Sequence, residues 1–162
     1  MIIEHFPEWV QIFLFSMFPG FESRIVVPLV AMHQFGWDWW EAFPISIAGN
    51  MFLVPFILKF FHKVEGYLYR FPRWARAMDW GFPLVRKRAD SKIRRYETAA
   101  LLFFVAIPLP FTGAGLGSLI AYLFDLRFSR SLLMIFIGVL ISTSMTTLIY
   151  ITGIQWFFFR SY

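Results

Sequence analysis

Glu22 and Arg24 are two oppositely charged residues in an otherwise apolar part of the sequence, directly after a Pro-Gly pair. The charge-free stretches on either side, 9–21 and 25–37, are each too short for a helix to cross about 30 Å of hydrocarbon. A charge at membrane depth costs at least ~2.5 kcal/mol and usually marks a transport path or a counter-ion. We therefore expect Arg24 to bind a phosphate or another anion and Glu22 to exchange a proton, with a purely structural ion pair as the alternative.

A second candidate segment, 108–117, contains two prolines and three glycines but no charge. The backbone N–H groups around Gly113 and Gly115, together with the Thr112 hydroxyl, could form an anion nest that faces Arg24. Close packing of helices through small residues explains the glycines equally well.

Other polar residues lie in longer apolar stretches. Asn50 could line the same cavity, although a hydrogen bond between helices is the simpler interpretation. The hydroxyl-rich band 142–147 is expected to serve packing first and a transport path second, because Ser and Thr can bond to a carbonyl four residues back.

Catalysis and cofactor binding have no support in the sequence. The three histidines, His5, His33 and His62, are far apart and lack the spacing of metal ligands, and the chain has no cysteine. We expect no enzyme activity, no metal and no cofactor.

The composition indicates the setting of these residues. The chain has 162 residues, of which 59% are hydrophobic and only 15% charged, whereas a soluble domain has about a quarter charged. A small integral membrane protein with one domain, 1–162, is expected.

Charged residues divide the chain into apolar intervals that repeat one order, a broken segment followed by a continuous one. Interrupted segments at matching positions of two halves are typical of inverted-repeat transporters. The sequence thus predicts an all-α integral membrane protein, an inverted repeat of a re-entrant helical hairpin plus a transmembrane helix, with an amphipathic cytoplasmic connection. The expected parts are a first repeat 1–60, a basic connection 61–97 and a second repeat 98–162, with spans at 42–58 and 131–159.

The distribution of charge favours hairpins over one long kinked helix in 9–35. The stretch 59–97 holds 11 of the 15 Lys and Arg residues, and two hairpins would put Arg127 and Arg130 on the same side of the membrane. By the positive-inside rule this side is cytoplasmic, and both termini lie outside a prokaryotic inner membrane. The aromatic and basic segment 67–95 then lies along anionic headgroups, so membrane lipids and not nucleic acid are the expected partners. A homodimer is plausible for so small a chain.

Two stretches resemble a known family. Pro19-Gly20-Phe21-Glu22-Ser23-Arg24-Ile25-Val26-Val27-Pro28 and the segment 105–121, which begins Val-Ala-Ile-Pro-Leu-Pro, are similar to the signatures of small multidrug export-type proteins, of the DedA superfamily. The resemblance implies two re-entrant hairpins and, from several members, movement of polyprenyl phosphate carriers across membranes. Phe111 stands where the family usually has glycine, and the second segment lacks the arginines typical of DedA proteins. The substrate-binding residues expected from the residues and the resemblance together are Glu22, Arg24, Pro28, Asn50, Pro108, Pro110, Thr112, Gly113 and Gly115.

Three functions are consistent with this pattern. The leading hypothesis is a flippase for polyprenyl phosphate or a related anionic lipid, with the headgroup between the two hairpin tips and possible coupling to protons. The second is export of small cationic drugs, with Glu22 as the cation site. The third is a membrane scaffold without transport, in which the tips would tolerate substitution.

Overall fold

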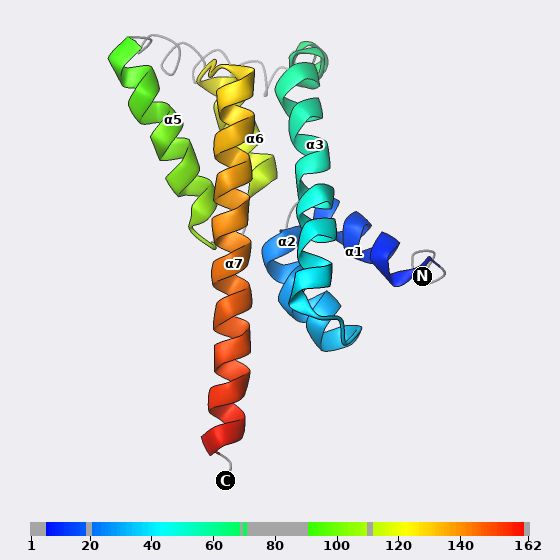
Figure 1. Cartoon of the computed structure of the whole chain (residues 1–162). Helices are drawn as coiled ribbons and strands as arrows, with labels where there is room; N and C mark the ends of the chain where they lie inside the picture. Colours follow the sequence, from blue (N-terminus) through cyan, green and yellow to red (C-terminus); the bar gives the residue numbers. More distant parts are fainter. Residues whose placement is uncertain (1–5, 19–20, 69, 71–90, 110–111, 161–162) are drawn as a thin grey trace.

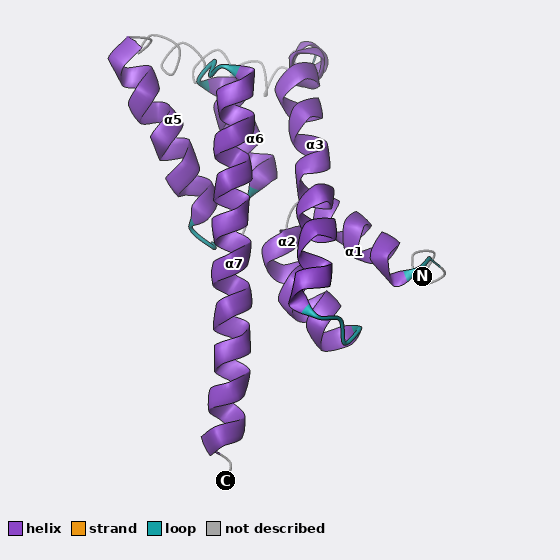
Figure 2. Cartoon of the chain, viewed as in Figure 1, coloured by secondary structure: helices purple, strands orange, loops and turns teal. Residues whose placement is uncertain are grey.

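The chain forms helices and no strand in the residues that the computed structural model describes, which are 6–18, 21–68, 70, 91–109 and 112–160 (Figure 2). For 62–68, 91–95 and 154–160 the description covers the backbone alone. The all-helical prediction is confirmed for this part of the chain. The helices are α1 (Glu8–Met17), α2 (Glu22–Ile25), the π-helix η2 (Val26–Gln34), α3 (Trp39–Leu68), α5 (Ser91–Ala106), α6 (Ala114–Leu123) and α7 (Phe128–Arg160).

Two helices, α3 and α7, are long and apolar enough to cross a membrane. Their apolar stretches are Trp39–Phe61 and Phe128–Gly153, with mean hydropathies of 1.6 and 2.2. In the most apolar 18 residues of each, only 28% and 33% are buried inside the molecule, so most residues there keep exposed surface that lipid could contact. The two predicted spans are confirmed as helices, and both helices continue beyond the predicted ends.

The remaining helices form two pairs. The first helix pair is α1 with α2–η2, and the second helix pair is α5 with α6. Phe18 has an extended backbone (φ −74°, ψ 128°), which separates α1 from α2. Figure 1 shows that α5 and α6 run in opposite directions and that the turn between them lies beside the middle of α7. The predicted breaks near 19–24 and 108–113 are therefore present, while the predicted connection 61–97 overlaps α3 and α5 and has its middle, 71–90, outside the described residues.

Each helix pair packs against both long helices. In the first pair α1 packs on α3 and α2 on α7, and in the second pair α5 packs on α7 and α6 on α3. Gly49 of α3 allows the approach of α1, because a Cβ there would lie 2.3 Å from the Phe13 carbonyl oxygen. Gly138 of α7 does the same for α5, since its Cβ would lie 2.8 Å from Cβ of Val105. Small residues thus let the helix backbones approach closely, which favours helix packing where the hydrophobic effect does not drive association.

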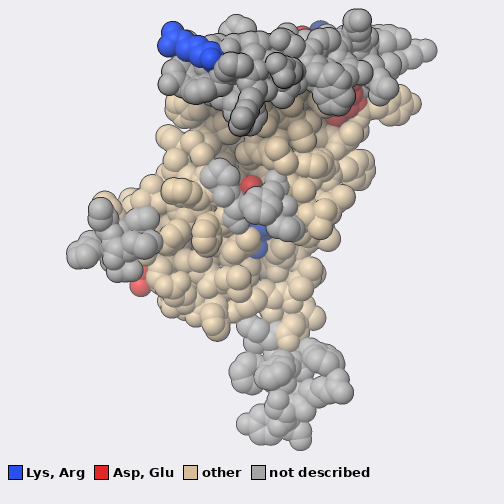
Figure 3. All heavy atoms as spheres, turned by 180° about the vertical axis from the view of Figure 1, so that it is seen from behind, with Lys and Arg blue, Asp and Glu red and all other residues tan. Residues whose placement is uncertain are grey.

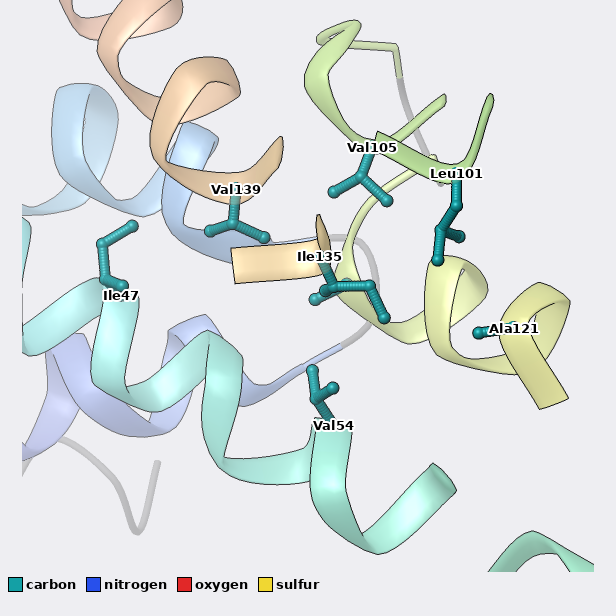
Figure 4. Close-up of a cluster of buried hydrophobic side chains, with 8 residues drawn as sticks. Ile47, Val54, Leu101, Val105, Ala121, Ile135 and Val139 are labelled. Carbon is teal, nitrogen blue, oxygen red and sulfur yellow. The ribbon is translucent and has the colours of Figure 1, made fainter. Parts of the chain in front are cut away.

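The apolar core lies where the second helix pair meets the long helices. Figure 4 shows side chains of α3, α5, α6 and α7 converging there, with α7 between α3 and α5. A smaller cluster joins α1, η2 and the beginning of α3. The buried polar side chains include Ser23, Asn50 and Thr143. The core residues in Figure 4 include Ile47, Val54, Leu101, Val105, Ala121, Ile135 and Val139.

Candidate functional site

A buried polar pocket lies where both interrupted segments meet the middle of α3 and α7. On the face that Figure 3 shows, the described side chains around the middle of the molecule are almost all uncharged, apart from one small red spot and one small blue spot. The side chains close on one another and leave no room between them for a water molecule. The pocket is lined by Glu22, Ser23, Arg24, Asn50, Val105, Gly113, Val139, Ser142 and Thr143.

Arg24 connects the first helix pair to the turn of the second. One of its guanidinium nitrogens donates to the Thr112 hydroxyl at 3.1 Å and to the Ile107 carbonyl at 3.4 Å. The other forms a salt bridge with Glu22, and both side chains of this pair are 7% exposed. Because an unpaired buried charge is costly, each of these partners stabilises the charged arginine.

Glu22 lies against the beginning of α6. Gly113 is the residue that precedes α6, and a Cβ built on it would lie 1.4 Å from a carboxylate oxygen of Glu22. Only glycine leaves room for the carboxylate at this place. The N-terminus of a helix carries partial positive charge, so this position favours an anion.

A second set of hydrogen bonds fixes α2 to the long helices. The Ser23 hydroxyl is 2.7 Å from the Thr143 hydroxyl of α7, and the Asn50 amide of α3 donates to Ser23 at 2.9 Å. All three side chains are buried. Asn50 therefore makes the hydrogen bond between helices that was expected, and it also lines the pocket.

The structure brings together five of the nine residues expected from the sequence, and they are Glu22, Arg24, Asn50, Thr112 and Gly113. Pro28 is buried in η2, and Pro108 is half-buried in the turn after α5. Gly115 has open space at its Cβ position, and Pro110 lies outside the described residues.

The expected substrate-binding residues did not include three hydroxyl residues of the pocket, Ser23, Ser142 and Thr143, although the band 142–147 was expected to serve a transport path after packing. Ser23 lies between the two charges and could have been recognised from that position. Nothing in the sequence distinguishes Ser142 and Thr143 from the other hydroxyls of the band 142–147. Gly117 has a packing role, because a Cβ there would lie 2.6 Å from the Val105 side chain.

The donor set of the pocket fits an anion or a proton better than a metal ion. No group of three His, Cys, Asp or Glu side chains that could hold a metal occurs among the described residues. The pocket offers one acid and one arginine, with hydroxyls and an amide around them.

In a comparison with protein families, residues 22–145 match the model described as Putative small multi-drug export protein. The matched region begins at Glu22 and includes every described residue of the pocket. No curated protein and no solved structure matches the chain.

Proposed function

The chain belongs to the small multi-drug export protein family, and we propose that it is a membrane transporter that moves an anionic lipid such as a polyprenyl phosphate. The family description points to export and not to catalysis. In this proposal the headgroup binds between the two interrupted segments, Arg24 holds it, and Glu22 exchanges a proton during the cycle. The single observation that carries the proposal is the buried Arg24–Glu22 pair at the beginning of α6.

The preference for an anion follows from the groups around the Glu22 carboxylate. The Arg24 guanidinium and the N-terminus of α6 are both positive, and Glu22 is the one acid among the residues that line the pocket. When Glu22 takes up a proton, these positive groups lose their counter-ion. An incoming phosphate or carboxylate would then replace Glu22, and loss of the proton would expel it. Proton and anion would therefore move together.

An apolar groove beside the pocket supports an amphiphilic substrate. The groove has a volume of about 590 Å³ and lies between α3 and α7, lined by Met51, Pro55, Ser129, Leu132, Leu133 and Phe136. Met51 directly follows Asn50 of the pocket, and Phe136 lies one turn before Val139. An isoprenoid chain in this groove would lie about one helix turn from the pocket that contains Arg24.

The packing of the helix pairs supports two re-entrant hairpins in an inverted repeat, as in the DedA superfamily. In each half the first helix of the pair packs on the long helix that follows it, and the second helix packs on the other long helix. Gly49 and Gly138 make equivalent close contacts, and each directly precedes a residue of the pocket. The proposed topology has the end of α3 and the beginning of α7, both close to basic residues, in the cytoplasm of a prokaryotic cell. Both termini of the chain lie outside.

Export of small cationic drugs is the second candidate, and the family description favours it. The cation would have to replace Arg24 as the ion-pair partner of Glu22. The guanidinium would then keep only the Thr112 hydroxyl and the Ile107 carbonyl as partners among the described residues. Both candidates need Glu22, but only the first needs the positive charge of Arg24.

The test uses purified protein in liposomes with a fluorescent polyprenyl phosphate, whose movement between leaflets is followed by a quencher on one side. Arg24→Ala should slow the movement at least ~10-fold, because a hydrogen bond to a charged group contributes about 1.5–3 kcal/mol. Arg24→Lys should retain part of the rate. Arg127→Ala is the matched control, since Arg127 is exposed and far from the pocket.

Two outcomes would contradict the lipid proposal. One is an unchanged rate for Arg24→Ala, and the other is proton-dependent efflux of a cationic dye that survives in Arg24→Ala but is lost in Glu22→Gln. Thermal stability gives an independent measurement, because a lipid phosphate at 100 times its Kd should stabilise the folded protein by about 2.7 kcal/mol.

A further inference from the structure

Two hydroxyl groups of α7 are buried without a hydrogen-bond partner. The Ser142 and Thr147 side chains are 3% and 4% exposed, and neither oxygen has a partner among the described residues. A buried hydroxyl without a partner costs about 1–3 kcal/mol. The two residues are five positions apart on one helix, so the cost is concentrated in one part of the molecule.

The other buried hydroxyls among the described residues avoid this cost. Ser16, Ser118 and Ser131 each bond to the carbonyl four residues before them, at 2.8, 2.6 and 3.1 Å. Thr146, a direct neighbour of Thr147, also bonds to its own helix. Ser142 and Thr147 could do the same, but their hydroxyl oxygens make no such bond.

Ser142, from the pocket that it lines, and Thr147, from its spacing along the helix, belong to the side of α7 that meets the first helix pair. Ser142 lines the pocket that contains Glu22 and Arg24. Thr147 is one turn beyond Thr143, which bonds to Ser23 of α2, and one turn before Tyr150. The Tyr150 ring in turn contacts the ring of His33 near the end of η2, with 6.5 Å between centroids.

The contact therefore extends from the pocket along α7 in the direction of Arg160, because both α2 and η2 pack on α7 and His33 reaches Tyr150. Its ionisable groups include the Glu22–Arg24 pair at the inner end, and His33 and Tyr150 at the outer end. His33 is exposed, so the outer end of the contact opens at the surface.

The helix opposite α7 is itself unusual. Nine residues, Val26–Gln34, form a π-helix, a conformation that is rare beyond a single turn and is frequent at functional sites. Pro28 contributes, because it has no N–H to donate to the preceding turn. The π-helix ends at Gln34, Gly36 beyond it has a φ of +72°, and the Trp37 N–H bonds to the Ala31 carbonyl.

We infer that the contact between α2–η2 and α7 is an access path for water and protons, which connects Glu22 with the surface at the His33 and Tyr150 end. Ser142 and Thr147 are the groups that bind water when the contact opens. The path deepens the proposed function, because it supplies the proton that Glu22 exchanges. It is entered from the side of the membrane at which α7 ends.

The chain has no cysteine, so single cysteines can be introduced without background. The experiment measures the reaction of Ser142→Cys and Thr147→Cys, in sealed liposomes, with a charged, membrane-impermeant methanethiosulfonate. Because only a hydrated thiolate reacts, both variants should be labelled at least ~10-fold faster than Ser118→Cys, a buried control on α6. Labelling should occur from the side of the C-terminal end of α7 and not from the other.

A second control separates water from lipid. Leu148 is 67% exposed on α7, so Leu148→Cys would lie in lipid and should stay unlabelled. Thermal unfolding in detergent shows whether each variant folds, and Thr147→Val, which removes the hydroxyl but keeps the shape, should fold as well as the wild type.

Labelling of neither cysteine in folded protein, or equal labelling of Ser118→Cys, would overturn the path. The proposed function can fail separately. If both cysteines are labelled as expected while no polyprenyl phosphate moves, the path stands and the substrate proposal falls. If transport persists with both positions unreactive, the path alone is wrong.

Discussion

The two helix pairs contribute different chemistry to one pocket. The first pair provides the charges of Glu22 and Arg24 and the Ser23 hydroxyl, whereas the second provides a hydroxyl, a carbonyl and the space at Gly113. Outside the pocket they pack alike, since Gly49 and Gly138 allow equivalent helix contacts. The helix packing is therefore equivalent in the two halves, whereas the binding groups differ. The first helix pair provides the charged groups, and the second helix pair provides the space and the uncharged partners around them.

The largest effect on the pocket is expected when the charge of Arg24 is removed from the first helix pair. Arg24→Ala leaves the Glu22 carboxylate buried without its partner, and we expect a loss of about 3–5 kcal/mol in the free energy of unfolding. The double variant Glu22→Gln with Arg24→Gln should recover much of this loss, because no buried charge remains. Denaturant or thermal unfolding in detergent measures both.

Arg127→Ala serves as the control, and a change within about 0.5 kcal/mol is expected at this exposed position. A double variant as unstable as Arg24→Ala would show that the two side chains act separately and that the pair is not a unit.

The second helix pair is tested at its glycines. In Gly113→Ala the new methyl group would overlap the Glu22 carboxylate, and we expect a loss of about 1–3 kcal/mol and a displaced Glu22. Gly115→Ala is the matched control, because its Cβ meets open space within α6 and alanine favours a helix by about 0.5–1 kcal/mol. The two alanines, two residues apart, should therefore change thermal stability in opposite directions. Equal losses would mean that the turn, and not the place of Glu22, needs glycine.

The sequence predicted the charges of the pocket better than its hydroxyls, for a physical reason. Charges inside a membrane are rare and costly, so Glu22 and Arg24 were recognisable from their surroundings, and prolines and glycines marked the turn before Thr112 and Gly113. Ser142 and Thr143 belong to a band in which almost every side chain has a hydroxyl. Which of these reaches α2 depends on tertiary packing.

The π-helix η2 was beyond sequence reasoning altogether. An ordinary helix presents residues 3.6 positions apart on one face, and a π-helix changes that spacing, so the face of 26–34 that meets α7 does not follow from the usual period. Pro28 indicated a disturbance in this segment but not its kind. The boundaries of the long helices were also underestimated, because charged residues at membrane ends continue a helix as readily as apolar ones do.

The smallest expected effect concerns Thr112, whose hydroxyl bonds to Arg24 from the turn of the second helix pair. Thr112 accepts a hydrogen bond from Arg24 at 3.1 Å and has the carbonyls of Ile107 and Leu109 within 3.0 and 2.9 Å of its own hydroxyl. Thr112→Val should cost about 0.5–1.5 kcal/mol, while Thr112→Ser should keep the bonds and most of the stability. In the Arg24→Ala background the cost of Thr112→Val should shrink to the part due to the turn alone, as a double-mutant cycle of unfolding free energies would measure. An unchanged cost in that background would mean that Thr112 serves only its own turn, and the charge of the first half would then have no side-chain partner in the second among the described residues.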